Sequence, residues 1–128
     1  MILSQLLGGD LRALAQDLDI PVLAGLQHQG DVSVVPAAMV HDYVEPATYV
    51  PAEGVAVVQA LSNGNTHLLL ASGDVRYSPS DGWLTLGSLH VPPGAEAYLD
   101  HPEHGNSGIA PGRYVLRRKR ELTGLVID

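Results

Sequence analysis

The 128-residue chain has no cysteine and no phenylalanine, and only 16% of its residues are charged. Without cysteine it can form neither a disulfide framework nor a thiolate zinc site. Any metal would therefore need imidazole and carboxylate ligands. No run approaches the roughly 18 to 20 consecutive apolar residues of a membrane span, and residues 1–7 lack the basic start of a signal peptide. The missing signal predicts a cytoplasmic protein, and the missing apolar span predicts no membrane partner.

Basic residues are also scarce. The sequence has 7 basic and 14 acidic side chains, which gives a net charge of −7. Arg12 is the only base in residues 1–75, whereas Arg117, Arg118, Lys119 and Arg120 are adjacent. The acidic balance argues against a general nucleic-acid binder, which relies on many Lys and Arg contacts to phosphates. The basic run has three explanations: protection of a sheet edge, pairing with an acidic neighbouring subunit, or, least favoured, nucleic-acid contact.

Two kinds of hydrophobic spacing divide the chain. Leucines recur every three or four residues in residues 1–19, which predicts helical structure interrupted at Gly8-Gly9. This face, including Leu3, Leu6 and Leu7, would pack on the domain core or on a partner. From residue 31 onward the period is two, with Pro and Gly punctuation, which is typical of an all-β domain. The predicted strands are 31–36, 55–61, 66–72, 74–77, 83–86, 89–91, 96–99 and 113–122, with residues 36–54 running along an edge.

We therefore predict a mainly β fold, a small barrel or sandwich of about eight strands with an N-terminal helical segment. The helical segment would span residues 1–24, and a single β domain would span residues 25–128. A chain of this length can bury one core but not two independent ones.

Histidines offer the best candidate for chemistry. His101, Glu103 and His104 lie within four residues, and the glycines that follow predict a turn that could bring both rings to one side. With His67 they could form a three-ligand metal site, oriented by Asp100 and Glu103. No zinc signature such as H-E-x-x-H is present. The alternatives are histidines bonded to backbone or in a subunit contact, and metal-free acid–base catalysis with Glu103 or Asp100.

Five short elements resemble the pattern of an uncharacterised bacterial family of small β proteins, over about residues 28–121. The elements are Gly30-Asp31-Val32, Gly64-Asn65-Thr66-His67, Leu99-Asp100-His101-Pro102-Glu103-His104, Pro111-Gly112-Arg113-Tyr114 and Arg118-Lys119-Arg120-Glu121. The second element commonly holds two histidines in that family, and here it keeps only His67. The resemblance implies where histidines should lie and no established activity.

A partial resemblance links this chain to cupins, which are metal-binding β-barrels. The segment Gly87-Ser88-Leu89-His90-Val91-Pro92-Pro93-Gly94 is similar to the second cupin motif with one residue fewer before Pro92. His101 follows Gly94 by seven residues, whereas cupins place a histidine three residues after that glycine. The resemblance implies a small barrel with histidines at one end.

The favoured function is a non-enzymatic binding or assembly module that forms a homo-oligomer. Its leucine-rich start and acidic front half would meet the basic run at Arg117 to Arg120 of a neighbour, and such a head-to-tail contact closes into a ring. The alternative is a metal-dependent enzyme or sensor that holds a divalent transition metal on His67, His101 and His104. A serine hydrolase is not expected, because no G-x-S-x-G element is present.

Overall fold

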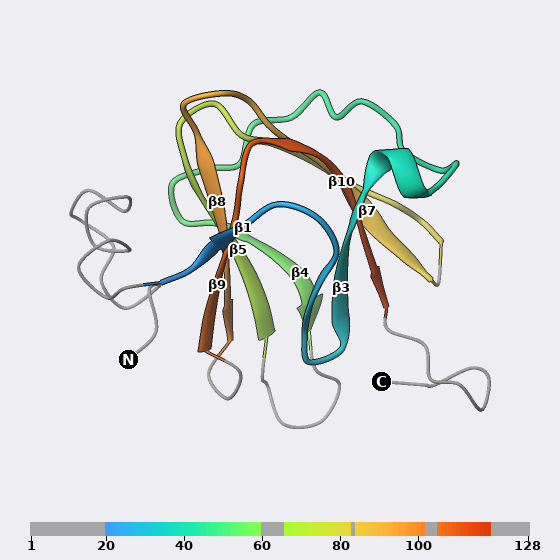
Figure 1. Cartoon of the computed structure of the whole chain (residues 1–128). Helices are drawn as coiled ribbons and strands as arrows, with labels where there is room; N and C mark the ends of the chain where they lie inside the picture. Colours follow the sequence, from blue (N-terminus) through green and yellow to red (C-terminus); the bar gives the residue numbers. More distant parts are fainter. Residues whose placement is uncertain (1–19, 60–65, 83, 102–104, 119–128) are drawn as a thin grey trace.

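Two five-stranded β-sheets form the protein in the computed structural model, which describes residues 20–59, 66–82, 84–101 and 105–118 (Figure 1). The elements in chain order are β1 (Val22–Leu23), β2 (Gln27–Gln29), β3 (Val32–Pro36), the short 3-10 helix η2 (Ala37–Met39), β4 (Val55–Gln59), β5 (Thr66–Ser72), β6 (Arg76–Pro79), β7 (Thr85–Val91), β8 (Glu96–His101), β9 (Gly105–Ile109) and β10 (Gly112–Arg118). The first sheet has the order β1-β9-β8-β5-β4 and the second β2-β3-β10-β7-β6. Strand pairs are antiparallel except β1 with β9.

The main core lies between the sheets and draws alternate residues from both. Leu69 and Leu99 of the first sheet share one buried cluster with Leu89 and Leu116 of the second. Because side chains alternate across a strand, one face of each sheet supplies this core. The prediction of a mainly β fold is confirmed, and the described strands form two open sheets and not a closed barrel.

A smaller apolar cluster covers the outer face of the first sheet. Leu70 and Tyr98 form its buried part, with Ile20, Val22 and Leu68 packed around them. The leucine run of β5 is thus buried on both sides, as expected of a central strand with near-continuous apolar sequence. The strand predicted at 66–72 coincides with β5, and the one predicted at 31–36 agrees with β3 within one residue.

Residues 85–86 of the strand predicted at 83–86 and the whole strand predicted at 89–91 belong to one strand, β7. The prediction left a gap at residues 87–88, and glycine inside a strand normally weakens it. Here Gly87 is needed for packing, since a Cβ at this position would collide with the ring of Tyr77 on β6. The strand predicted at 74–77 is shifted to Arg76–Pro79.

Three strands were not predicted: β1, β2 and β9. The sequence of β9, Gly-Asn-Ser-Gly-Ile, predicts a turn because its first four residues disfavour strands. Gly108 nevertheless fits there, since a Cβ would lie 2.7 Å from the Pro21 carbonyl oxygen and 2.7 Å from Cγ2 of Val22. This close approach lets β1 pair with β9, so part of the range 1–24 that was predicted as helical belongs to the sheet. Residues 1–19 and the end of the strand predicted at 113–122 lie outside the described residues.

A long connection, residues 41–50, leaves η2 and crosses the outer face of the second sheet; we call it the strap. The prediction placed it along a sheet edge, which holds only at its end. There the Tyr77 amide donates to the Thr48 carbonyl and the Val50 amide to the Val75 carbonyl, at the edge strand β6. Earlier in the strap, the Val44 amide donates to Ser88 on β7 at 3.1 Å. The sequence pattern missed the crossing because it depends on contacts with side chains distant in sequence.

Candidate functional site

A buried polar cluster lies between the sheets at one end of the molecule. His67 near the start of β5 and His101 at the end of β8 are 3% and 4% exposed, and their ring centroids are 4.3 Å apart at 36°. The β5–β8 register explains this contact, because the pair Leu68 and Asp100 is followed by His67 opposite His101. Directly opposed residues on antiparallel strands have side chains on the same face within contact distance. Two of the three predicted ligands are therefore neighbours.

Gln29, at the end of β2 in the second sheet, joins this pair to the opposite sheet. Its amide nitrogen donates to the carbonyl oxygens of Leu99 at 3.0 Å and Gly105 at 3.1 Å. Carbonyl oxygens can only accept, so these bonds fix which end of the amide is the nitrogen. The amide oxygen then lies 3.0 Å from Nδ1 of His67, which must donate. Neutral His67 consequently carries its proton on Nδ1 and its lone pair on Nε2.

The other predicted site residues have different positions. Asp100 is buried, but it alternates with His101 along β8 and shares the outer face of the sheet with Tyr98. It is therefore not beside the histidine rings. His104 and Glu103 lie outside the described residues, and among those that are described no group of three His, Cys, Asp or Glu side chains is placed to hold a metal.

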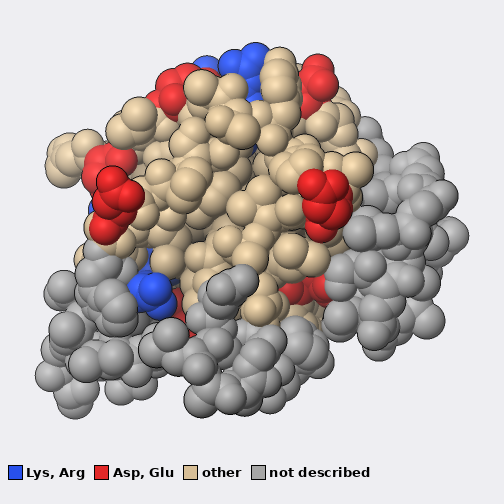
Figure 2. Space-filling model, turned by 180° about the vertical axis from the view of Figure 1, so that it is seen from behind, with Lys and Arg blue, Asp and Glu red and all other residues tan. Residues whose placement is uncertain are grey.

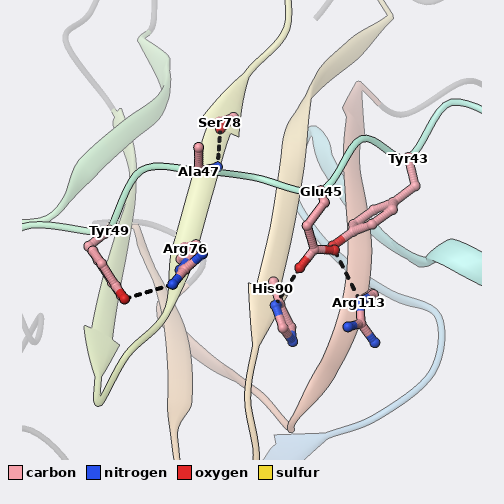
Figure 3. A network of polar contacts seen from close by, with 8 residues as sticks. All are labelled: Tyr43, Glu45, Ala47, Tyr49, Arg76, Ser78, His90 and Arg113. Carbon is pink, nitrogen blue, oxygen red and sulfur yellow. Dashed lines mark hydrogen bonds and ion pairs between the residues drawn. The ribbon is translucent and has the colours of Figure 1, made fainter.

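A second polar site lies on the outer face of the second sheet, beneath the strap. The side chains there form cross-strand rows, because residues paired across neighbouring strands share a face. One row joins Arg76 on β6, His90 on β7 and Arg113 on β10. Figure 3 shows the strap passing over these three strands, with Glu45 above the row.

Glu45 is the centre of this network (Figure 3). One carboxylate oxygen lies 2.8 Å from Nδ1 of His90, and the other accepts from the Tyr43 hydroxyl at 2.7 Å and from Nε of Arg113 at 3.1 Å. The Tyr43 and Arg113 hydrogen bonds lower the pKa of Glu45 below its ordinary 4.5. Burial, reinforced by the adjacent Glu45 carboxylate, raises the pKa of Tyr43.

A parallel arrangement binds the beginning of the strap. Asp42 accepts from the Thr85 hydroxyl at 2.6 Å and from Nη2 of Arg117 at 2.7 Å. These donors, Thr85 foremost, hold the pKa of Asp42 below its ordinary 3.8. Two arginines of β10 are thus paired with acids of the strap. Arg113 pairs with Glu45, and Arg117 pairs with Asp42.

These pairs bear on the proposed subunit contact through the basic run. Arg117 is bonded to an acid of its own chain, and Arg118 is described at the end of β10 and also makes an interaction. The other residues assigned to that contact, Leu3, Leu6, Leu7, Lys119 and Arg120, lie outside the described residues. Homo-oligomer formation therefore stays a prediction, and one nitrogen of Arg117 is already paired with Asp42 of the same chain.

The residues that sequence reasoning missed are Gln29, Asp42 and Glu45. A single glutamine gives no periodic signal, so nothing in the sequence marks Gln29 as buried. Asp42 and Glu45 lie in the proline-containing segment that was expected to run along a sheet edge. The only available signal was that acids in an otherwise apolar connection need partners, and their partners are 75 and 68 residues away.

The distribution of charge on the surface and the length of the helices bear on possible partners. On the face turned away from Figure 1, acidic side chains lie around a broad uncharged area, and the described residues form no extended basic patch there (Figure 2). No helix in the described ranges is long and apolar enough to cross a membrane.

The fold and these two sites define a class: a two-sheet β protein with a histidine pair buried between the sheets and a strap tied across one outer face. The chain belongs to a family described as a domain of unknown function, DUF8820, whose model matches residues 28–119. No curated protein and no solved structure matches it. The expectation of an uncharacterised family over about residues 28–121 is confirmed at the level of the family. The individual motifs and the cupin resemblance stay predictions.

Proposed function

We propose that the protein binds a divalent transition metal through the paired imidazoles of His67 and His101. The single observation that supports this most is the placement of the two rings, buried side by side with 4.3 Å between their centroids. Imidazole nitrogen is a ligand suited to Zn, Cu, Ni and Fe. Sequence proximity makes His104, with Glu103 beside it, the proposed source of the remaining ligands.

The role of Gln29 supports the same proposal. A ligating histidine usually donates its second ring N–H to an acceptor, which fixes the tautomer and the ring orientation. The Gln29 amide oxygen is such an acceptor for Nδ1 of His67. Gln29 is itself held by backbone carbonyls of β8 and β9, so the acceptor is rigidly placed.

Cobalt titration of metal-depleted protein tests the proposal, because Co²⁺ bound by nitrogen ligands absorbs visible light and protein without bound Co²⁺ does not. We expect saturable binding that is lost in His101→Gln and weakened about 10- to 100-fold in Gln29→Leu, the usual effect of removing an orienting partner. His90→Gln is the matched control, since His90 lies on the other sheet beside Glu45. Cobalt binding that survives in both His67→Gln and His101→Gln would overturn the proposal.

A further inference from the structure

A hollow of about 290 Å³ opens on the outer face of the second sheet, beside the strap. It is lined by the apolar residues Leu26, Val35 and Leu84 and by the polar residues His28, Ser33, Arg117 and Arg118. The volume lies near the lower end of small-molecule sites, which span roughly 300 to 1,000 Å³. The combination of apolar walls with a few converging polar groups is the usual composition of such sites.

Three of the polar residues of the hollow come from one cross-strand row. His28 of β2 is paired with Ser33 of β3, and Ser33 is paired with Arg117 of β10. Residues paired in this way have side chains on one face of the sheet. Nδ1 of His28 lies 2.7 Å from the Ser33 hydroxyl, so the imidazole and the hydroxyl are already oriented toward each other. The row therefore presents hydrogen-bonding groups at fixed positions on rigid strands.

Arg117 is the charged residue of the row, and one of its nitrogen donors has no acceptor among the described residues. Its Nη2 donates to Asp42, but its Nε is buried and has no hydrogen-bond partner among the described residues. A buried donor without an acceptor is rare in folded proteins and calls for an explanation such as a bound ligand or water. The edge of a guanidinium that includes Nε matches the two oxygens of a planar carboxylate.

We propose that this hollow binds a small organic acid. Its carboxylate would be held by Arg117, with the His28–Ser33 pair beside it, and its hydrocarbon part would lie against Leu26, Val35 and Leu84. A carboxylate fits better than inorganic phosphate, because the lining provides apolar surface that phosphate cannot use. The site is separate from the histidine pair, which faces the space between the sheets.

Hexanoate is a suitable probe, with hexanamide as its neutral isostere and inorganic phosphate as a competing anion. Binding is followed by amide shifts in ¹H–¹⁵N correlation spectra of the full chain. We expect saturable shifts with hexanoate at millimolar concentration, centred on Ser33, Val35, Leu84 and Arg117. Hexanamide should cause weaker shifts, and phosphate should not displace hexanoate. Equal binding of hexanamide, displacement by phosphate, or no saturable shift would each overturn the proposal.

Variants locate the site. Arg117→Gln should weaken hexanoate binding about 10- to 100-fold, the effect of losing a hydrogen bond to a charged group. Arg113→Gln is the matched control, because Arg113 lies on the same strand and face and is also paired with a strap acid, Glu45. His28→Ala keeps the test independent of folding, since His28 is exposed on an edge strand. Undiminished binding in both Arg117→Gln and His28→Ala would contradict the inference.

Discussion

Replacing Gln29 by leucine tests whether one amide joins the two sheets. The side chain is 4% exposed and donates to the carbonyls of Leu99 and Gly105, while its oxygen accepts from His67. Leucine has a similar size but no polar atoms, so these three groups and the Ser107 hydroxyl lose a partner in a largely buried place. A buried polar group left unpaired costs about 1–3 kcal/mol. Part of that cost is offset by the transfer of an apolar side chain into the core.

We therefore expect Gln29→Leu to lower the free energy of unfolding by about 2–4 kcal/mol. Proteins of this kind are stable by only about 5–15 kcal/mol in total, so the effect is large. Urea denaturation followed by circular dichroism measures it, with an unchanged slope showing that the transition stays two-state. Gln27→Leu is the matched control, because Gln27 lies two residues earlier on β2 and its side chain makes an exposed bond to the Leu23 carbonyl. Equal losses of less than about 0.5 kcal/mol in both variants would refute the reasoning.

Three other predictions concern the strap and the first sheet. Glu45→Gln should change the free energy of unfolding by no more than about 1 kcal/mol, as exposed ion pairs do, while strap amides exchange about fivefold faster in hydrogen-exchange measurements. Because the pKa values of Asp42 and Glu45 are lowered by folding, their stabilisation is full above their ordinary values of 3.8 and 4.5 and is lost as the pH falls below them. Urea titrations from about pH 5 downward should therefore show a steeper loss in the wild type than in a double variant, Asp42→Asn with Glu45→Gln. Gly108→Ala should cost about 1–3 kcal/mol, because its methyl group would crowd the β1 backbone.

Each of these has a control and a contrary result. Glu53→Gln removes an exposed acid outside the strap, and equal exchange rates in it and in Glu45→Gln would show that Glu45 does not hold the strap in place. Identical pH profiles of the wild type and the double variant would show that the strap acids have no linked stability. Gly82→Ala is the control for Gly108→Ala, since its nearest atom would be 3.6 Å away. Equal stability of those two variants would contradict the proposed close approach.

The sequence predicted strands where hydrophobic pattern and punctuation agreed. The run of β5 is apolar and bounded by turn residues, so its limits could be found. The strand β9 could not, because the reason for its glycine is the neighbouring backbone of β1, which a local pattern does not contain.

In the candidate site, too, local features could be predicted from the sequence and long-range contacts could not. Histidines stand out by residue type, which is why His67 and His101 could be named. Their contact depends on the β5–β8 register, and the bond from Gln29 depends on how one sheet lies on the other. Neither relation has a signature within a single segment. Residue chemistry was therefore predictable here, whereas the partners of each residue were not.

The position of β10 sets the order in which the protein can be completed during synthesis. It is the last strand described, yet it occupies the centre of the second sheet, between β3 and β7. Until residues 112–118 have left the ribosome, β2 with β3 and β6 with β7 are two separate hairpins with unpaired inner edges. The strap acids Glu45 and Asp42 likewise have no ion-pair partner on β10 until Arg113 and Arg117 have been synthesised. A nascent chain halted before β10 therefore exposes two strand edges to aggregation, and the last strand closes both at once.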